Sequence, residues 1–310
     1  MRARGFTAAA VVLFIIGMAQ ATAPLYRFTS AGNYPRATAT IPLGIGKGQI
    51  VGYYSAPSQN LGYIQTGKNF ISVDPRKSIT SHVEGINSHG AAVGGYCPAG
   101  CNMQAGVHGF SYEDGKLTDI DYPLPSTTTT ANGINDRGDI VGGYCTGTGY
   151  TSCPIGQESP AIFGFLLKKG IYTTLAFPGA QESQASAINN AGDVVGIYLI
   201  NNTGPHAYLY KDGVYTTIDY PGSVYTVAYA VNTSGVVAGV YGDQSTTHGF
   251  TYSNGTFTQI DAPNSVGTAV TGINDRGDIV GLRNLSLGQD NFRGIPLSAV
   301  STPLAAFRDS

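Results

Sequence analysis

Short runs of β-type residues follow one another along the chain after its first twenty residues. In one complete stretch the runs are His248–Tyr252, Thr256–Ile260, Thr268–Ile273 and Asp278–Leu282, and turn sequences such as Ser-Asn-Gly separate them. No sustained helical period of apolar residues occurs after the first segment. The pattern therefore predicts an all-β chain of short strands.

The strand pattern repeats along the chain. The segment GINDRGDIVG occurs at Gly133–Gly142 and Gly272–Gly281, and related copies begin at Gly85, Ala187 and Ala230. A more divergent copy, LGIGKGQIVG, begins the series. The last glycines of the copies are separated by 42, 48, 54, 43 and 42 residues and are Gly52, Gly94, Gly142, Gly196, Gly239 and Gly281. Four strands in a period of this length are typical of a β-propeller blade.

Six copies predict a β-propeller of six four-stranded blades, with five or seven blades as alternatives and an open β-solenoid as the competing architecture. The segment Tyr26–Pro42 is similar to half of a repeat, and the last repeat lacks a good second half. We therefore expect the N- and C-terminal strands to pair and close the ring. Residues 22–310 are expected to form this single domain.

The first 21 residues have the order of a secretory signal peptide. Arg2 and Arg4 precede the apolar run Ala8–Met18, and Ala19-Gln20-Ala21 follows as a small-x-small cleavage pattern. An uncleaved anchor is the alternative. We expect a secreted or periplasmic protein with no membrane span after signal removal.

Four cysteines in an exported chain predict disulfides. Cys97 and Cys145 each follow Val-Gly-Gly-Tyr, so they occupy equivalent repeat positions, and Cys101 and Cys153 lie in the loops after them. Equivalent positions in neighbouring blades diverge from the axis. The expected pairs are therefore Cys97–Cys101 and Cys145–Cys153.

Charge and composition narrow the possible functions. The chain has 17 basic and 19 acidic side chains, and only 12% of its residues are charged. A nucleic-acid binder would need a basic face, so this class is excluded. No phosphate-binding loop, nucleophile elbow or zinc-protease motif occurs in the sequence. We therefore expect no cofactor and no metal and assign no catalytic residue. A non-enzyme is favoured, with an enzyme as the alternative. A monomer is expected.

The two repeated motifs, GIN-x-x-G-x-x-x-G and H-[GA]-[FY], resemble the HAF repeat, a bacterial extracellular repeat named for the second motif. The second motif reads HGFSYEDGKLTDIDYP from His108, HAYLYKDGVYTTIDYPG from His206 and HGFTYSNGTFTQIDAP from His248. The resemblance implies an exported repeat protein without an assigned activity. It implies no catalytic residues.

An asparagine recurs in the first motif with glycine three residues later, at Asn87, Asn135, Asn189, Asn232 and Asn274. An Asn side chain bonds nearby backbone amides and Gly accepts a positive φ, so these residues are expected to build structural turns. Calcium binding is the alternative, because Asn135, Asp136 and Asp139 place oxygens in one loop.

The second motif provides the candidate ligand residues of the axial channel: His108, His206 and His248. They converge only if the axis is narrow; otherwise each is expected to cap its own strand. The Asp of the I-D-x-P segments recurs as well, at Asp74, Asp121, Asp219 and Asp261. It is expected to cap a turn, with an acidic collar as the alternative.

The regular pattern favours a binding or interaction scaffold that uses one face of the propeller. The long insert Thr146–Ala161 departs most from the repeat, and Tyr150, Gln157 and Glu158 within it are the candidate binding residues. The expected partner is a protein or a carbohydrate. The alternatives are a lyase or hydrolase that acts on a polysaccharide or cyclic peptide at the axial channel, and a self-associating surface-layer component.

Overall fold

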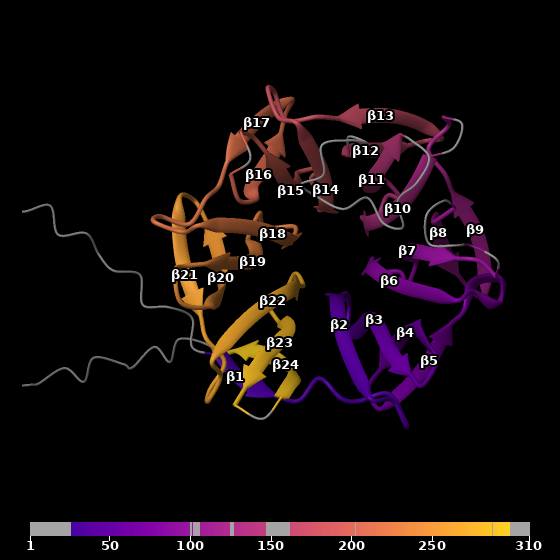
Figure 1. Cartoon of the computed structure of the whole chain (residues 1–310), viewed down its shortest axis with the longest axis horizontal. Helices are drawn as coiled ribbons and strands as arrows, with labels where there is room; N and C mark the ends of the chain where they lie inside the picture. The colour runs from indigo at the N-terminus through magenta and orange to yellow at the C-terminus, as the bar shows by residue number, and fades with distance from the viewer. Residues whose placement is uncertain are drawn as a thin grey trace, which may run out of the picture.

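The computed structural model describes residues 26–99, 101, 106–124, 127–146, 162–201, 203–286 and 288–297. In these residues the chain forms 24 β-strands, and its helical structure is limited to one 3-10 turn at Pro75–Lys77. The strands are arranged around a central axis (Figure 1). The predicted all-β class is confirmed. No helix in the described part of the chain is long and apolar enough to cross a membrane.

The strands form consecutive antiparallel units of four, which we call blades one to six. Blade one contains β2 (Ala39–Ile45), β3 (Gln49–Ala56), β4 (Gln59–Thr66) and β5 (Asn69–Val73). Blade two contains β6 (Thr80–Ile86), β7 (Ala92–Cys97), β8 (His108–Glu113) and β9 (Lys116–Ile120). Blade three contains β10 (Thr127–Ile134), β11 (Ile140–Thr146), β12 (Ile162–Lys168) and β13 (Ile171–Leu175).

The second half of the chain continues this order. Blade four contains β14 (Glu182–Ile188), β15 (Val194–Leu199), β16 (His206–Lys211) and β17 (Val214–Thr217). Blade five contains β18 (Tyr225–Val231), β19 (Val237–Gly242), β20 (Thr247–Ser253) and β21 (Thr256–Ile260). Blade six contains β22 (Gly267–Ile273), β23 (Ile279–Leu285), β24 (Gly288–Pro296) and β1 (Tyr26–Thr29). By hydrogen bonding these are five sheets, because one bridge between Asn60 and Thr80 joins blades one and two.

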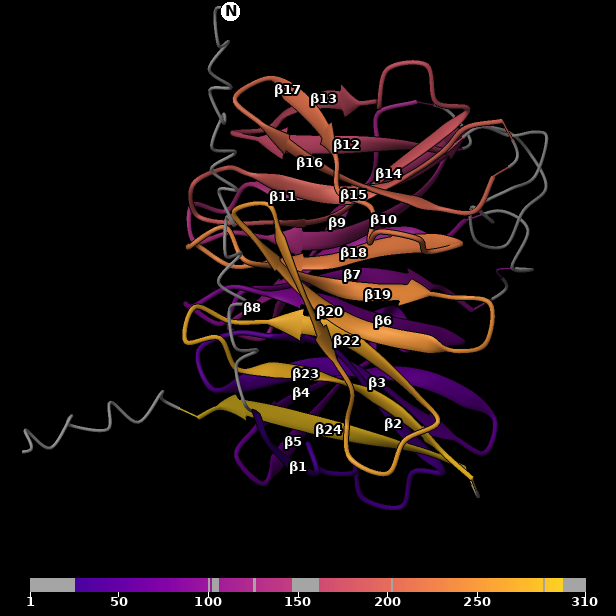
Figure 2. The same ribbon diagram turned by 90° about the vertical axis from the view of Figure 1, so that its left-hand side faces the viewer.

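The two ends of the described chain meet in blade six. Strand β1 pairs antiparallel with β24, with Tyr26 opposite Pro296 and Thr29 opposite Arg293 (Figures 1 and 2). Beside this pair, the Thr271 hydroxyl donates to the Pro42 carbonyl oxygen at 2.8 Å, so blades six and one are also in contact. The arrangement is that of a β-propeller.

The hydrophobic core lies between neighbouring blades. One cluster combines Val93 and Ile120 of blade two with Ala131 and Phe165 of blade three, and all four are buried. Burying both faces of each sheet in this way explains why a repeat that has two apolar faces requires neighbours.

Stacked aromatic rings also join the blades. An aromatic residue at the end of the second motif stacks on the second-strand tyrosine of the next blade, with ring centroids 3.6 Å apart for Tyr122 and Tyr144 and 3.7 Å apart for Phe177 and Tyr198. Tyr220 stacks on Tyr241 in the same manner. The repeated tyrosines therefore pack between blades.

Each inner strand, the first strand of its blade, contains a β-bulge at the same position. The ladder skips one residue per strand, and the skipped residues are Leu43, Glu84, Asn132, Ser186, Tyr229 and Thr271. A bulge bends the strand and redirects the side chain of the extra residue. The repeat thus presents one variable residue per blade on a fixed backbone.

The last glycine of the first motif lies opposite this bulge. A Cβ at Gly94 would lie 1.9 Å from the His82 carbonyl oxygen and 2.8 Å from the Phe110 ring, which is paired with Gly94 across the ladder. The other five final glycines meet an inner-strand carbonyl at 1.9–2.1 Å in the same way. Glycine is therefore required here by close approach of the backbone, and the aromatic residue of the second motif packs over it.

Cys97 and Cys101 form a disulfide with their Cα atoms 5.7 Å apart, as expected. The second expected pair, Cys145–Cys153, includes Cys153, which lies outside the described residues.

The glycine requirement can be tested with two neighbouring glycines of β7. Gly94→Ala should lower the free energy of unfolding by roughly 3 kcal/mol, because the added methyl group overlaps a backbone carbonyl that cannot move alone. Gly95→Ala is the matched control, since its Cβ comes no closer than 3.3 Å to the Thr130 side chain, and should change stability by less than about 1 kcal/mol. Urea unfolding measures both, and equal effects would contradict the explanation.

Candidate functional site

A pocket of about 440 Å³ lies on the axis at one face of the molecule. Its lining consists of the end of each inner strand and the turn that follows it, from all six blades. Because the Cys97–Cys101 loop follows β7 and the pocket turn precedes it, the pocket and this disulfide lie at opposite ends of the strand. The pocket face is therefore not the face that carries the disulfide loop.

The same three residues of each repeat build the pocket in layers. The floor is an apolar ring of Ile45, Ile86, Ile134, Ile188, Val231 and Ile273. The next residue of each repeat is an Asn, or Gly46 in blade one. The rim is polar and mixed in charge and consists of Lys47, Ser88, Asp136, Asn190, Thr233, Asp275 and Arg276.

The asparagines connect each blade to the next. The Nδ2 of Asn87 donates to the Asn135 carbonyl oxygen at 3.1 Å, and Asn135 donates in turn to the Asn189 carbonyl oxygen at 3.2 Å. The series continues from Asn189 to Asn232 at 3.0 Å and from Asn232 to Asn274 at 3.2 Å, and ends with Asn274 donating to Gly46 at 3.5 Å. We call these five asparagines the Asn belt. Blade one accepts from the belt but has no side chain to donate onward.

The other atom of each belt amide shapes its own turn. Asn135 Oδ1 accepts from the backbone amides of Arg137 and Asp139, both at 3.0 Å, and Asn274 accepts from the equivalent pair. Asn189 Oδ1 accepts from the amides of Gly192 and Asp193, both at 2.9 Å. All five side chains are buried. Each amide therefore fixes a turn through its oxygen and a neighbouring blade through its nitrogen.

The acids of these turns are held by hydrogen bonds. Asp139 is buried, with 4% of its surface exposed, and accepts from Asn135 Nδ2 at 3.0 Å and from Arg137 Nε at 3.1 Å. In the Arg-Gly-Asp tripeptide at Arg137–Asp139 the Asp is therefore buried, while Arg137 and Gly138 are exposed. In the described part of the chain, no group of three or more His, Cys, Asp or Glu residues is placed to hold a metal ion.

Asp136 on the rim contacts the turns on both sides. It accepts from the Ser88 amide at 2.8 Å and from Asn190 Nδ2 at 2.7 Å. Burial opposes ionisation of this carboxyl, but the hydrogen bonds from Ser88 and Asn190 and the nearby His89 outweigh it and lower its pKa. Asp136 is therefore a fixed negative charge on the pocket rim.

The three repeat histidines lie in different blades, outside the axial pocket lining. Each sits at the start of the third strand and is held by the Asp 13 residues later: His108 Nδ1 lies 3.0 Å from Asp121, and His206 Nδ1 lies 2.6 Å from Asp219. His248 Nδ1 lies 2.9 Å from Asp261. The structure thus pairs each histidine with the carboxylate of its own blade.

Two of these pairs have further partners. Thr203 Oγ1 lies 2.8 Å from His206 Nε2, which gives a hydroxyl–imidazole–carboxylate series, but this hydroxyl also donates to the Ile200 carbonyl oxygen at 2.7 Å. Its proton is thus directed to the backbone and not to the imidazole. The series therefore fixes the loop before β16.

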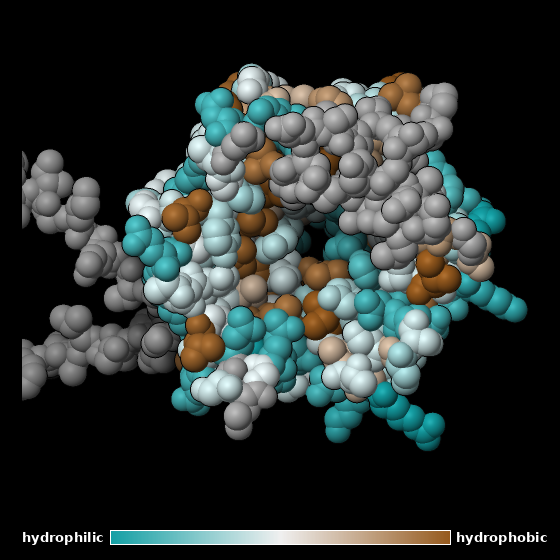
Figure 3. Space-filling view, viewed as in Figure 1, coloured by the Kyte–Doolittle hydropathy of each residue, from teal (hydrophilic) through white to brown (hydrophobic). Residues whose placement is uncertain are grey.

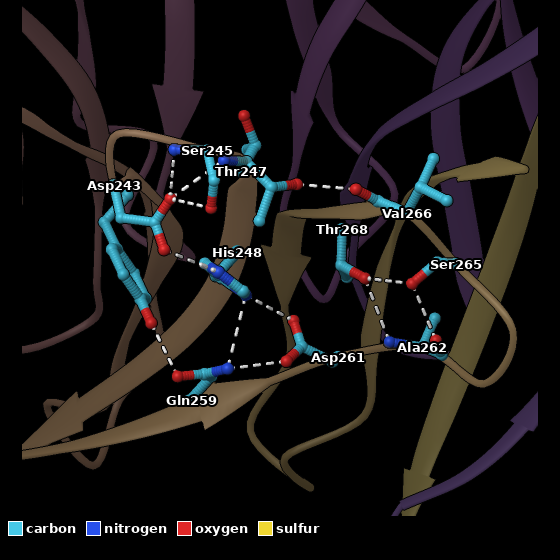
Figure 4. Close-up of polar contacts among 12 residues, drawn as sticks. Asp243, Ser245, Thr247, His248, Gln259, Asp261, Ala262, Ser265, Val266 and Thr268 are labelled. Carbon is cyan, nitrogen blue, oxygen red and sulfur yellow. Dashed lines mark hydrogen bonds and ion pairs between the residues drawn. The ribbon is translucent and has the colours of Figure 1, made fainter.

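His248 lies between two carboxylates (Figure 4). Its Nε2 lies 3.4 Å from Asp243, and Gln259 bridges His248 and Asp261. Burial lowers the pKa of His248, but Asp261 and Asp243 together outweigh burial and raise it above the ordinary value.

The candidate binding residues of the insert and the six bulge residues remain to be placed relative to the sequence predictions. Tyr150, Gln157 and Glu158 lie outside the described residues. The sequence reasoning did not identify the bulge residues as axis-lining positions; the signal is that each lies two residues before the pocket Ile or Val of its repeat.

No family model and no curated protein matches this chain. Several solved propellers are similar at low identity. The β-propeller domain of the Trilobed protease from Pyrococcus furiosus is 10% identical with a TM-score of 0.49, over 92% of this chain and 99% of that chain. The fucose-specific lectin from Aleuria aurantia is 12% identical with a TM-score of 0.46, over 89% and 97% of the two chains. A putative gluconolactonase is 12% identical with a TM-score of 0.45, over 88% and 94%.

The two carboxylates around His248 predict a pH-dependent contribution to stability. Because the folded state raises the pKa of His248, the contribution is present below the ordinary imidazole pKa of about 6.5 and is lost as the pH rises through the raised value. His248→Gln should therefore lower the melting temperature more at pH 5.5 than at pH 9. His89→Gln, at a site with a side chain 63% exposed, is the control. An effect of His248→Gln that is independent of pH would contradict this assignment.

Proposed function

We propose that this chain is an exported six-bladed β-propeller that binds a sugar-sized polar ligand in its axial pocket. The single observation that carries the proposal is the pocket itself: all six blades contribute an apolar floor residue and a polar rim residue, and five of them contribute an asparagine of the Asn belt. Its volume of about 440 Å³ lies within the usual range of small-molecule sites. The pairing of β1 with β24 supports ring closure, and with it the constant geometry of the pocket.

The chemistry of the pocket favours binding over catalysis. Its lining contains no His or Cys, and its Asp136 carboxyl has a lowered pKa and is held by two hydrogen bonds. A general acid or base needs a pKa near the working pH. A lyase or hydrolase at this pocket would therefore need a proton-transfer group other than Asp136.

The arrangement of groups favours a carbohydrate over a protein as the ligand. Carboxylate, amide and guanidinium groups at the rim can bond hydroxyl groups in pairs, while the isoleucine floor accepts the apolar face of a sugar ring. The Asn belt and the turn hydrogen bonds hold these groups before any ligand arrives, which lowers the entropy cost of binding.

Export and family membership complete the proposal. The Cys97–Cys101 disulfide is compatible with an oxidising compartment outside the cytoplasm. Together with the signal-like residues 1–21 and the two repeated motifs, it supports an exported protein of the HAF-repeat type.

Blocking the pocket tests the proposal. Thr233→Trp places a large side chain on the rim at a position whose own side chain is exposed, so it should fill the pocket without disturbing the Asn belt. A glycan array probed with the unaltered protein should identify at least one bound saccharide, and Thr233→Trp should weaken that binding by at least about tenfold.

Ser234→Trp is the matched control, because Ser234 is exposed in the same turn but does not line the pocket. It should bind like the unaltered protein. Binding that survives Thr233→Trp would place the site elsewhere and contradict the proposal.

A further inference from the structure

The six bulge residues form a second ring around the axis, deeper than the pocket. Consecutive inner strands touch backbone to backbone beside the bulges: a Cβ at Gly85 would lie 2.9 Å from the Asn132 carbonyl oxygen, and one at Gly272 would lie 3.1 Å from the Gly44 Cα. The inner strands therefore enclose a narrow channel. Figure 3 shows that the centre of the ring is open in this view.

Glu84 is the one carboxylate in this ring. It lies two residues before the pocket residue Ile86 on β6 and does not line the pocket. Its side chain is 31% exposed, yet burial raises its pKa to about 7. A group that is both surrounded by protein and open to solvent fits a position inside a water-filled channel.

Glu84 has few partners among the described residues. The ionisable group paired with it is His82 on the same strand, with Nδ1 3.8 Å from the carboxylate. Burial lowers the pKa of His82, which favours its neutral form. A carboxylate in such surroundings is destabilised unless a positive charge compensates it.

Two tyrosines lie on strands near this carboxylate, one across the axis on β18 and one beside His82 on β3. Tyr229, the bulge residue of β18, is 42% exposed, and β18 and β6 face each other across the centre of the ring (Figure 1). Burial raises the pKa of Tyr229, and the charges of Tyr225 and Glu84 raise it further. Tyr53 of β3 lies beside His82, with ring centroids 4.4 Å apart.

We propose that the axial channel beside Glu84 binds an organic ammonium group, with Glu84 as the counter-ion and the rings of Tyr229 and Tyr53 as the aromatic contacts. A carboxylate combined with aromatic faces is the environment that attracts an alkylated cation. A calcium ion would need six to eight oxygen ligands, and this ring offers a single carboxylate. The site is separate from the axial pocket and does not depend on its ligand.

The groups that face Glu84 decide the pH dependence. His82 lies on its own strand, Tyr53 on β3 and Tyr229 on β18. The other four bulge residues, Leu43, Asn132, Ser186 and Thr271, carry no charge. Toward the pocket end of the axis the charged residues are Lys47, Asp136, Asp275 and Arg276. Protonation of Glu84 and of His82 both oppose a bound cation, so acidification weakens binding through either group.

The experiment is a titration of the purified protein with tetramethylammonium, followed by NMR chemical shifts, at pH 8 and pH 5.5. A carboxyl with a pKa of about 7 predicts binding about 30-fold weaker at pH 5.5, because the ionised fraction falls by that factor. Neopentyl alcohol, a neutral molecule of the same shape, should bind weakly and equally at both pH values.

Three variants make the test specific. Glu84→Gln should abolish tetramethylammonium binding, whereas Glu113→Gln, at an exposed hairpin position, should leave it unchanged. Tyr229→Leu should weaken it several-fold and Tyr229→Phe should not. Glu84→Gln is expected to fold, because the folded state disfavours ionisation of Glu84, so removing the charge should raise the melting temperature at pH 8 and change it little at pH 4. Binding that is unchanged in Glu84→Gln, or no binding at pH 8, would overturn the proposal.

Discussion

The arrangement around the axis depends on one buried amide in each of five repeats. In each belt asparagine, Oδ1 ends the inner strand by accepting backbone amides of its own turn, while Nδ2 donates to the carbonyl oxygen of the equivalent residue in the next blade. A buried amide left without partners would be strongly destabilising. The geometry of each turn and the position of the neighbouring blade therefore depend on each other. This link sets the distance between neighbouring blades, and with it the width of the pocket above and of the channel below.

The bulge and the final glycine of the first motif fix the packing of the inner strand next to this link. The bulge brings an inner-strand carbonyl onto the second strand, so that glycine is required opposite it, and an aromatic ring from the third strand fills the space. These three features occupy fixed positions in the repeat and leave the bulge residue free to vary. The chain thus combines a constant frame with one variable residue per blade at the bulge. Glu84 is the charged residue and Tyr229 the aromatic residue among these six positions. A constant frame with variable positions is a common basis for specific binding.

Much of the frame could be predicted from the sequence, because strands, turns and the repeat period are local properties. The period and the turn glycines predicted the four-stranded units, and the short spacing of Cys97 and Cys101 predicted their disulfide. The candidate site was harder, because it depends on which side chains point to the axis. The recurring histidines suggested a channel, yet each is held by an Asp that the hairpin between the third and fourth strands of its own blade brings beside it. Asn87 reaches Asn135 across 48 residues of sequence, and a repeat pattern alone does not show a contact between copies.

Hydrogen exchange tests the central claim most directly. The backbone amides of Asp139 and Asp193 donate to the Oδ1 of their own belt asparagines, in blades three and four. Asn135→Ser removes the Nδ2 that donates to the Asn189 carbonyl oxygen. If the belt couples the blades, this variant should speed exchange at Asp193 as well as at Asp139. Faster exchange confined to Asp139, with Asp193 protected as in the unaltered protein, would show that each turn is stabilised only within its own blade and would contradict the account.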